Sequence, residues 1–166
     1  MKTNISSLMS LISNEEKNIN NKIYGLSDIA TSTSIEELDG RVNVVEDNEK
    51  SFKTNLEDIE ESIKKLSKLK EILYRKNNEY KLSDNRTIQE AIVDNTYLRK
   101  LKEVYEQLLL NKTSKKRVTE VNNSYFECKK VNFDIDEIKK KLEEVDEKIH
   151  KTDFEISKLN SIEFEI

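Results

Sequence analysis

Hydrophobic residues recur every three or four positions along most of the chain, which predicts amphipathic helices. The clearest run lies between residues 35 and 80, where apolar side chains keep this spacing over about six heptads. Its members are Leu38, Val42, Val45, Phe52, Leu56, Ile59, Ile63, Leu66, Leu73 and Tyr80. Glu49, Lys70 and Asn77 interrupt this stripe at inward positions. A repeat this long is typical of a coiled coil.

The same spacing predicts three further helices. With the first run, the expected helices cover about residues 3–29, 35–80, 88–128 and 135–158, followed by a C-terminal tail at 159–166. Capping boxes, in which Ser, Thr or Asp precedes Glu by three positions, indicate where three of them begin. These pairs are Ser34 with Glu37, Thr87 with Glu90, and Asp134 with Glu137.

In two stretches the sequence pattern allows a structure other than a helix. Within 112–133 the helical phase slips near Lys112, and the apolar residues that follow alternate, so this segment is either a helix with a disturbed end or includes a short β excursion. Within 35–48, Gly40 and a polar stretch make the first turns of the long helix a candidate loop. The overall expectation is still an all-α fold, a single helical domain over residues 1–166.

A short polar connection at 81–86 predicts that the helices on either side of it form an antiparallel hairpin. Charge favours the same pairing, because residues 36–61 sum to −7 and residues 112–130 sum to +4. In such a hairpin these two segments would face one another and fix its orientation. The basic run Lys115-Lys116-Arg117 is then an intramolecular counterpart of the acidic segment, with a phosphate-binding patch as the alternative.

Narrow apolar stripes bury too little surface for single helices to be stable alone. Apolar residues also lie beside the main stripe and give some helices a second adhesive face: Leu69, Ile72, Tyr74, Leu109 and Leu110. We therefore expect a bundle of long antiparallel hairpins that associates with itself as a homo-oligomer.

Composition narrows the class of function. A net charge of −4 does not suit binding to a nucleic-acid duplex, and no apolar run approaches the ~20 residues of a membrane span. The lone Cys128 excludes an intramolecular disulfide and favours a reducing, cytoplasmic compartment. His150 is the only histidine, so a metal pair with Asp153 competes with the simpler interpretation of a solvated or capping side chain. Gly25 and Gly40 form no phosphate loop, and we expect no metal, no cofactor and no catalysis.

The connection at 81–86 is where we expect a ligand. A helix that begins beside Arg and Tyr side chains can hold an anion at its free amides and stack a ring against an aromatic side chain. Ordinary loop polarity with two capping interactions is the alternative interpretation of the same residues. The candidate ligand-binding residues are Tyr74, Arg75, Asn77, Tyr80, Lys81, Arg86, Thr87, Tyr97, Arg99 and Phe154.

The segment from about residue 70 to residue 158 resembles the septicolysin-like family of small helical bacterial proteins. The likeness rests on Asn77, on the helix start Thr87-Ile88-Gln89-Glu90-Ala91-Ile92, on Arg117, and on Val145-Asp146-Glu147-Lys148-Ile149 ahead of Asp153-Phe154. Asp153-Phe154 replaces the Asn-Trp of the family pattern. The resemblance implies a helical, oligomeric fold in which Asn77 and Thr87 lie near a shared structural or binding feature.

These features favour a non-catalytic, oligomeric binding protein. The specific hypothesis is sequestration of a small anionic, nucleotide-like signal, a role that would suit a phage or prophage antagonist of host defence. The alternative is a structural coiled-coil adaptor, or an inhibitor that binds another protein and has no small-molecule ligand.

Overall fold

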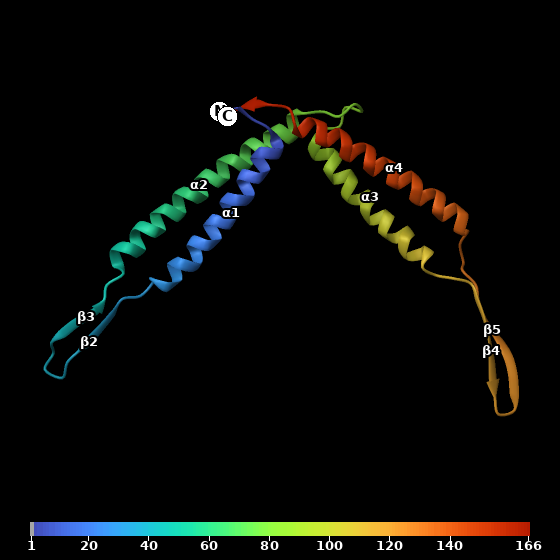
Figure 1. Ribbon diagram of the computed structural model, residues 1–166, viewed down its shortest axis with the longest axis horizontal. Helices are drawn as coiled ribbons and strands as arrows, with labels where there is room; N and C mark the ends of the chain where they lie inside the picture. Colours follow the sequence, from blue (N-terminus) through green and yellow to red (C-terminus); the bar gives the residue numbers. More distant parts are fainter. Residues whose placement is uncertain (1) are drawn as a thin grey trace. The chain divides into compact units, whose positions relative to one another are not determined.

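The computed structural model describes residues 2–166, which divide into two compact units. The first unit contains the chain up to Asn77 together with Asn160–Ile166, and the second unit is Asn78–Leu159. Each unit is a pair of helices that carries a β hairpin (Figure 1). The expectation of one domain over residues 1–166 stays a prediction.

In the first unit, helix α1 (Ile5–Asp28) lies beside helix α2 (Glu49–Glu79) (Figure 1). Asn4 caps α1, since its side-chain oxygen accepts the Ser7 N–H at 2.8 Å. The two helices run antiparallel. Lys22 Nζ donates to Ser62 Oγ at 3.1 Å, and Lys70 Nζ lies 2.6 Å from the Glu16 carboxylate.

The core of the first unit is a narrow aliphatic stripe: Ile5, Leu8, Ile12, Ile19 and Ile59. The two chain ends close this unit, because strand β1 (Lys2–Thr3) pairs antiparallel with strand β6 (Phe164–Glu165). The Lys76 ammonium lies 5.1 Å from the centre of the Phe164 ring, which fastens the end of the chain to α2.

In the second unit, helix α3 (Ile88–Leu109) runs antiparallel to helix α4 (Ile135–Asn160). Its buried apolar residues come from both helices and from the loop before α3: Leu82, Ile88, Ala91, Ile138, Val145 and Ile149. Polar pairs flank this core. Asn95 Nδ2 donates to Asp153 at 2.8 Å, and Lys102 Nζ donates to Asp146 at 2.5 Å.

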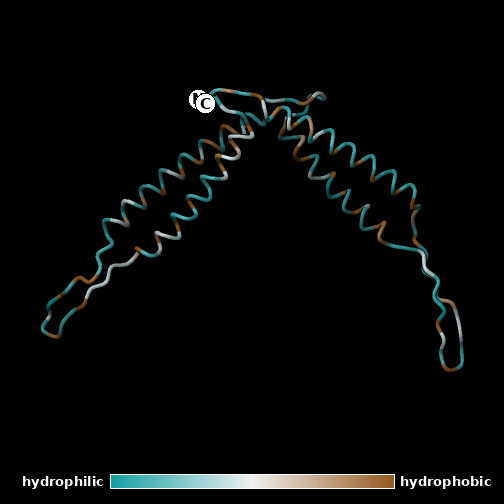
Figure 2. The backbone as a smooth tube through the Cα atoms, in the orientation of Figure 1, coloured by the Kyte–Doolittle hydropathy of each residue, from teal (hydrophilic) through white to brown (hydrophobic). Residues whose placement is uncertain are grey.

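Each helical pair is extended by a β hairpin. In the first unit, strand β2 (Thr33–Glu36) pairs antiparallel with strand β3 (Val42–Glu46). In the second unit, strand β4 (Ser114–Glu120) pairs antiparallel with strand β5 (Asn123–Lys129). Figure 2 shows hydrophobic segments in both hairpins as well as along the helices.

The prediction of an all-α coiled-coil fold is wrong, because residues 2–166 contain three two-stranded antiparallel sheets beside four helices. Residues 35–48 are largely the hairpin β2–β3. Gly40 has φ +85°, a turn conformation that favours glycine, and the valines around it are β-branched. The capping box predicted at Ser34 is also wrong, since Ser34 lies in β2.

The predicted helix over 88–128 ends at Leu109, and the β excursion considered within 112–133 is a full hairpin. Val118 lies opposite Tyr125 across the ladder, and the pairing of a β-branched with an aromatic side chain stabilises a sheet.

The predicted partner of the second helix is also wrong. Helix α2 packs along α1, and α3 packs along α4, so the helical hairpins are α1–α2 and α3–α4. The acidic and basic segments that were expected to face one another across a single hairpin belong to the hairpins of different units.

Among residues 2–166, no helix combines the length and the apolar character that a membrane crossing requires.

Candidate functional site

The loop between α2 and α3 folds tightly onto the start of α3. Leu82 N–H donates to the Arg86 carbonyl at 2.8 Å, and Asn85 N–H donates to the Leu82 carbonyl at 3.0 Å. Asn85 has φ 70°, a left-handed conformation that Asn tolerates better than most residues. This turn buries the Leu82 side chain and leaves Ser83 facing α4.

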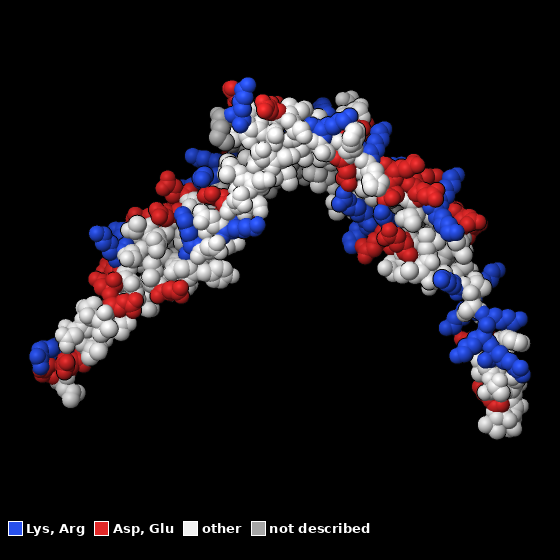
Figure 3. Space-filling view, in the orientation of Figure 1, with Lys and Arg blue, Asp and Glu red and all other residues white. Residues whose placement is uncertain are grey.

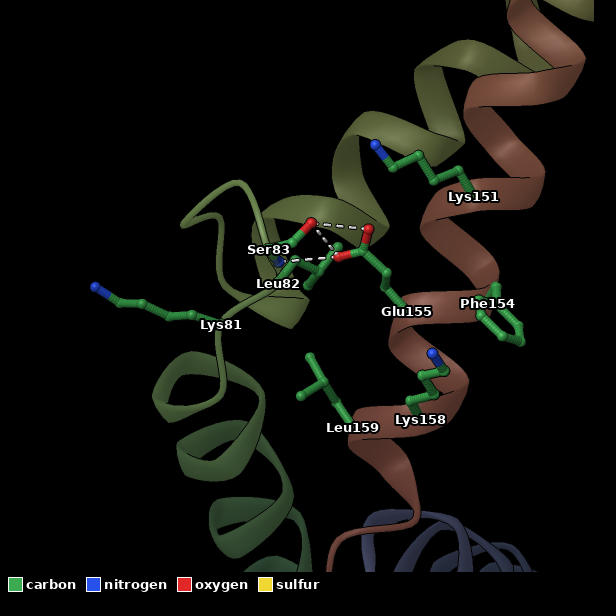
Figure 4. Close-up of a pocket in the computed structure, with 8 residues that line it drawn as sticks. All are labelled: Lys81, Leu82, Ser83, Lys151, Phe154, Glu155, Lys158 and Leu159. Carbon is green, nitrogen blue, oxygen red and sulfur yellow. Dashed lines mark hydrogen bonds between the residues drawn. The ribbon is translucent and has the colours of Figure 1, made fainter.

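Ser83 joins the loop to α4 through the carboxylate of Glu155. Its backbone N–H donates to Glu155 Oε2 at 2.9 Å, and its hydroxyl lies 2.9 Å from Oε1 and 2.8 Å from Oε2 (Figure 4). These hydrogen bonds, the backbone one first, hold the pKa of Glu155 below its usual value. Glu155 is therefore a fixed anion in the wall of the site.

A pocket of about 470 Å³ opens between this loop and the C-terminal half of α4 (Figure 4). Its volume falls in the range of small-molecule sites. Its lining combines apolar and charged side chains: Lys81, Leu82, Ser83, Lys151, Phe154, Glu155, Lys158 and Leu159.

The pocket is electropositive. Three lysines and one glutamate give its lining a formal charge of +2, and in the described part of the chain none of the three ammonium groups forms an ion pair. Lys158 Nζ lies 4.3 Å from the centre of the Phe154 ring, so the cation covers an aromatic face. Figure 4 shows Lys81 extending away from α4, so its aliphatic stem lines the pocket more closely than its ammonium does.

Two predicted arginines carry their own counter-ions. Arg86 Nη2 lies 2.6 Å from Asp84 Oδ2, and Arg86 Nη1 lies 2.6 Å from Asp94 Oδ2. The hydrogen bond from Arg86 lowers the pKa of Asp84, and both carboxylates raise the pKa of Arg86. Arg99 is paired in the same way with Asp153 at 2.7 Å. Both guanidinium groups stabilise the protein's own loop and helix pair.

The other predicted residues are separated by the structure. Thr87 caps α3 in the predicted capping box, because its hydroxyl accepts the Glu90 N–H at 3.1 Å and Glu90 accepts the Thr87 N–H at 2.7 Å. The Tyr97 side chain is exposed on α3. Of the ten predicted residues, Lys81 and Phe154 line the pocket.

Three predicted residues, Tyr74, Arg75 and Asn77, belong to α2 in the first unit. Tyr74 is exposed there, while Asn77 is buried and its Oδ1 has no hydrogen-bond partner in the described structure. Tyr80 precedes the loop in the second unit, and its carbonyl accepts the Ile88 N–H at 3.1 Å.

Sequence reasoning missed most of the pocket. Lys151, Glu155 and Lys158 recur at spacings of four and three on α4, which places them on one face of that helix. This spacing was a usable signal. Leu82 and Ser83 gave no such signal, since only the fold of the loop brings them to α4.

No group of three or more His, Cys, Asp or Glu side chains in residues 2–166 is arranged to hold a metal ion. His150 Nε2 lies 3.6 Å from Asp146, one helical turn earlier on α4. This contact is an ordinary i, i+4 pair on an exposed helix face.

The chain has a structural relative of the same size. A crystal structure of a functionally unknown conserved protein from Corynebacterium diphtheriae is similar over 99% of this chain and 100% of that chain, with a TM-score of 0.66 and 19% sequence identity. At this level of identity the likeness shows a shared fold and nothing further. No curated protein matches the chain significantly.

One family model covers most of the chain. The family of unknown function DUF6847 matches residues 26–160, a range that includes α2, α3, α4 and both extending hairpins. It also includes every residue that lines the pocket. The protein belongs to the DUF6847 family.

Proposed function

We propose that this protein binds a small anionic ligand with a ring or other apolar body, such as a nucleotide, in the pocket between the 81–83 loop and α4. The observation that carries the proposal is the combination of unpaired lysines with an apolar wall in a single pocket. Phosphate or carboxylate groups would contact the ammonium groups of Lys151 and Lys158. The apolar body would lie against Phe154 and Leu159.

The proposed role is binding without catalysis. No imidazole or thiol lines the pocket, and its carboxylate, Glu155, is already held by Ser83. A general base must be free to accept a proton from the substrate, and the lowered pKa of Glu155 makes it a weak base. A protein that binds without reacting is suited to sequestering its ligand, and removal of a nucleotide signal on behalf of a phage is the setting we propose.

We propose that this binding takes place in the cytoplasm. Cys128 is a free and exposed thiol, which suits a reducing compartment. The resemblance to the septicolysin-like family also remains a proposal, and what it implies here is a helical protein that binds a ligand.

Isothermal titration calorimetry against a panel of nucleotides tests the proposal. Lys151→Ala and Lys158→Ala should each weaken binding about tenfold, because each removes a charge-assisted contact. Raising the salt concentration should also weaken binding, since these lysines are accessible to counter-ions. Phe154→Ala should weaken binding of ligands that carry a ring more than it weakens binding of inorganic phosphate.

Lys140→Ala is the matched control, because Lys140 is an exposed lysine of α4 that does not line the pocket. Arg86→Ala and Tyr97→Ala separate this proposal from a site at the arginines and tyrosines of the loop. A nucleotide whose affinity depends on Arg86 or Tyr97 and is indifferent to Lys151 and Lys158 would contradict the proposal. Absence of heat with every member of the panel would also contradict it.

A second candidate function, binding to another protein chain, is favoured by one observation. Apolar side chains are exposed on both β hairpins, including Val42, Val44 and Phe126. A coiled-coil adaptor is not proposed, since the fold is not a coiled coil.

A further inference from the structure

In residues 2–166 the side chains of the two β hairpins are almost all exposed. All residues of β2, β3 and β5 are exposed, and in β4 only Val118 is half-buried. A two-stranded hairpin is marginally stable in water unless one of its faces packs against something. The exposed valines and aromatic side chains of these hairpins therefore indicate surfaces that become covered in an assembly.

The hairpins carry opposite charges. Residues 33–47, which contain β2–β3, sum to −4, and residues 112–130, which contain β4–β5, sum to +4. Figure 3 shows basic side chains gathered over β4–β5. Opposite net charges of equal size favour contact between two such surfaces and steer their encounter.

The basic charge of β4–β5 is concentrated on one face of the hairpin. Residues that are opposite in the ladder share a face, and so do alternate residues along a strand. By this rule Lys115, Arg117, Phe126 and Cys128 lie on one face, since Lys115 is opposite Cys128 and Arg117 is opposite Phe126. The Lys115 ammonium lies 4.6 Å from the centre of the Phe126 ring. This face is aromatic and basic, without a carboxylate among these four residues.

The hairpin β2–β3 has a face of complementary character. Thr33 is opposite Glu46 and Ile35 is opposite Asn43, so these four residues share a face. Glu37 lies beside them, because Asn43 Nδ2 donates to Glu37 Oε1 at 3.5 Å. This face combines two carboxylates with the exposed Ile35 side chain. The opposite face carries Ser34, Val42 and Val44 with the single carboxylate of Glu36.

We propose that the basic face of β4–β5 in one copy of the protein docks on the acidic face of β2–β3 in a second copy. Each copy carries one hairpin of each kind, so a pair of copies contains a partner of opposite charge for each of its four hairpins. The proposal is independent of the ligand pocket, because no residue of either hairpin lines that pocket.

Charge reversal with mixing tests the proposal. Glu36→Lys, Glu37→Lys and Glu46→Lys together change the charge of residues 33–47 from −4 to +2, and Lys115→Glu, Lys116→Glu and Arg117→Glu change that of residues 112–130 from +4 to −2. Sedimentation equilibrium should find the unaltered protein as a dimer of 19.5 kDa subunits. Each triple variant alone should dimerise roughly tenfold or more weakly. An equimolar mixture of the two variants should recover the dimer.

Disulfide trapping gives a second measurement. Asn43→Cys places a thiol on the acidic face, and Val44→Cys places one on the opposite face as the matched control. On mild oxidation, Asn43→Cys should form a covalent dimer through Cys128 of the other copy, and Val44→Cys should not. Far-UV circular dichroism of every variant checks that the helices are retained.

Three results would overturn the proposal. The first is an unaltered protein that is monomeric at high concentration and low salt. The second is an oligomer whose mass is indifferent to both triple variants. The third is a disulfide from Asn43→Cys that forms within one chain and leaves the mass at that of a monomer, because it would place the two hairpins together in the same copy.

Discussion

Ser83 and Glu155 are 72 positions apart in the sequence, and they are joined by the backbone N–H and the hydroxyl of Ser83 at 2.8–2.9 Å from the carboxylate. Both residues line the same pocket. This contact holds the 81–83 loop against α4 and gives the pocket one of its walls. The negative charge of Glu155 therefore helps to stabilise the second unit, because it strengthens the hydrogen bonds from Ser83.

The Ser83–Glu155 contact should make stability depend on pH in the acidic range. The pKa of Glu155 is lower in the folded protein than the value of 4.5 expected for an unperturbed glutamate. Its contribution to the free energy of unfolding is therefore present above about pH 4.5 and is lost as the pH falls through the lowered pKa. Ser83→Ala should destabilise the protein at pH 7, and this difference from wild type should shrink at pH 3.

Thermal unfolding at pH 7, 5 and 3 measures this effect. Ser67→Ala, at an exposed position of α2, is the control and should show a difference that does not vary with pH. A Ser83→Ala difference as large at pH 3 as at pH 7 would mean that the carboxylate charge is irrelevant to the contact.

The N-terminus of α3 should depend on Thr87. Its hydroxyl accepts the Glu90 N–H, which would otherwise be an unsatisfied donor at the start of the helix. Thr87→Ala should lower the free energy of unfolding by about 1 kcal/mol. Thr96→Ala is the matched control, because the Thr96 hydroxyl bonds the Ile92 carbonyl within the helix and leaves no orphan group when removed. Chemical denaturation should show a larger loss in the free energy of unfolding for Thr87→Ala than for Thr96→Ala. An equal loss in the two variants would contradict the capping role of Thr87.

The two glycines should respond in opposite directions to the same substitution. Gly40 has φ +85° in the β2–β3 turn, a conformation that costs an L-residue about 1–2 kcal/mol, so Gly40→Ala should destabilise the hairpin. Gly25 lies within α1 and a Cβ there would meet open space, so Gly25→Ala should stabilise the helix by about 0.5–1 kcal/mol. Thermal unfolding reports the gain at Gly25, and hydrogen exchange of the β2–β3 amides reports the loss at Gly40. Slower exchange in Gly40→Ala would contradict the turn assignment.

The sequence predicts buried residues best in a helix that packs one apolar stripe against one neighbouring helix. Leu8, Ile12 and Ile19 recur at helical spacing, and all three are buried in α1. The capping interactions at Thr87 and Asp134 also follow from local chemistry, and the structure contains both. These features depend on neighbours within one or two turns, which a single sequence displays directly.

The β hairpins were missed because two periodicities fit the same residues. Leu38, Val42 and Val45 keep helical spacing, while Val42 and Val44 alternate as in a strand. Asp39-Gly40 is a turn signal that favours the hairpin, whereas the heptad pattern extends over a longer stretch of sequence. The identity of helix partners was missed for a different reason, since short connections predict neighbours only when the chain does not divide into separate units there.

The pocket proposed as the ligand site lies at the loop named from the sequence, and the cations that line it are lysines, not the predicted arginines. Arginine often binds anions in proteins, and for this reason Arg86 and Arg99 are among the predicted ligand-binding residues. Asp84 and Asp94 lie close to Arg86 in sequence and could have been recognised as its partners. The pairing of Arg99 with Asp153 joins two helices, and a single sequence does not display such a contact.

We propose above all that the pocket between the 81–83 loop and α4 binds an anionic ligand. Chemical-shift mapping of the isotope-labelled protein, titrated with the nucleotide that gives the strongest heat, tests it most directly. The largest shifts should fall on the amides of residues 81–83 and 151–159, and Lys151→Ala together with Lys158→Ala should abolish them. Shifts that centre on α1 and α2, or that persist unchanged in the double variant, would contradict it.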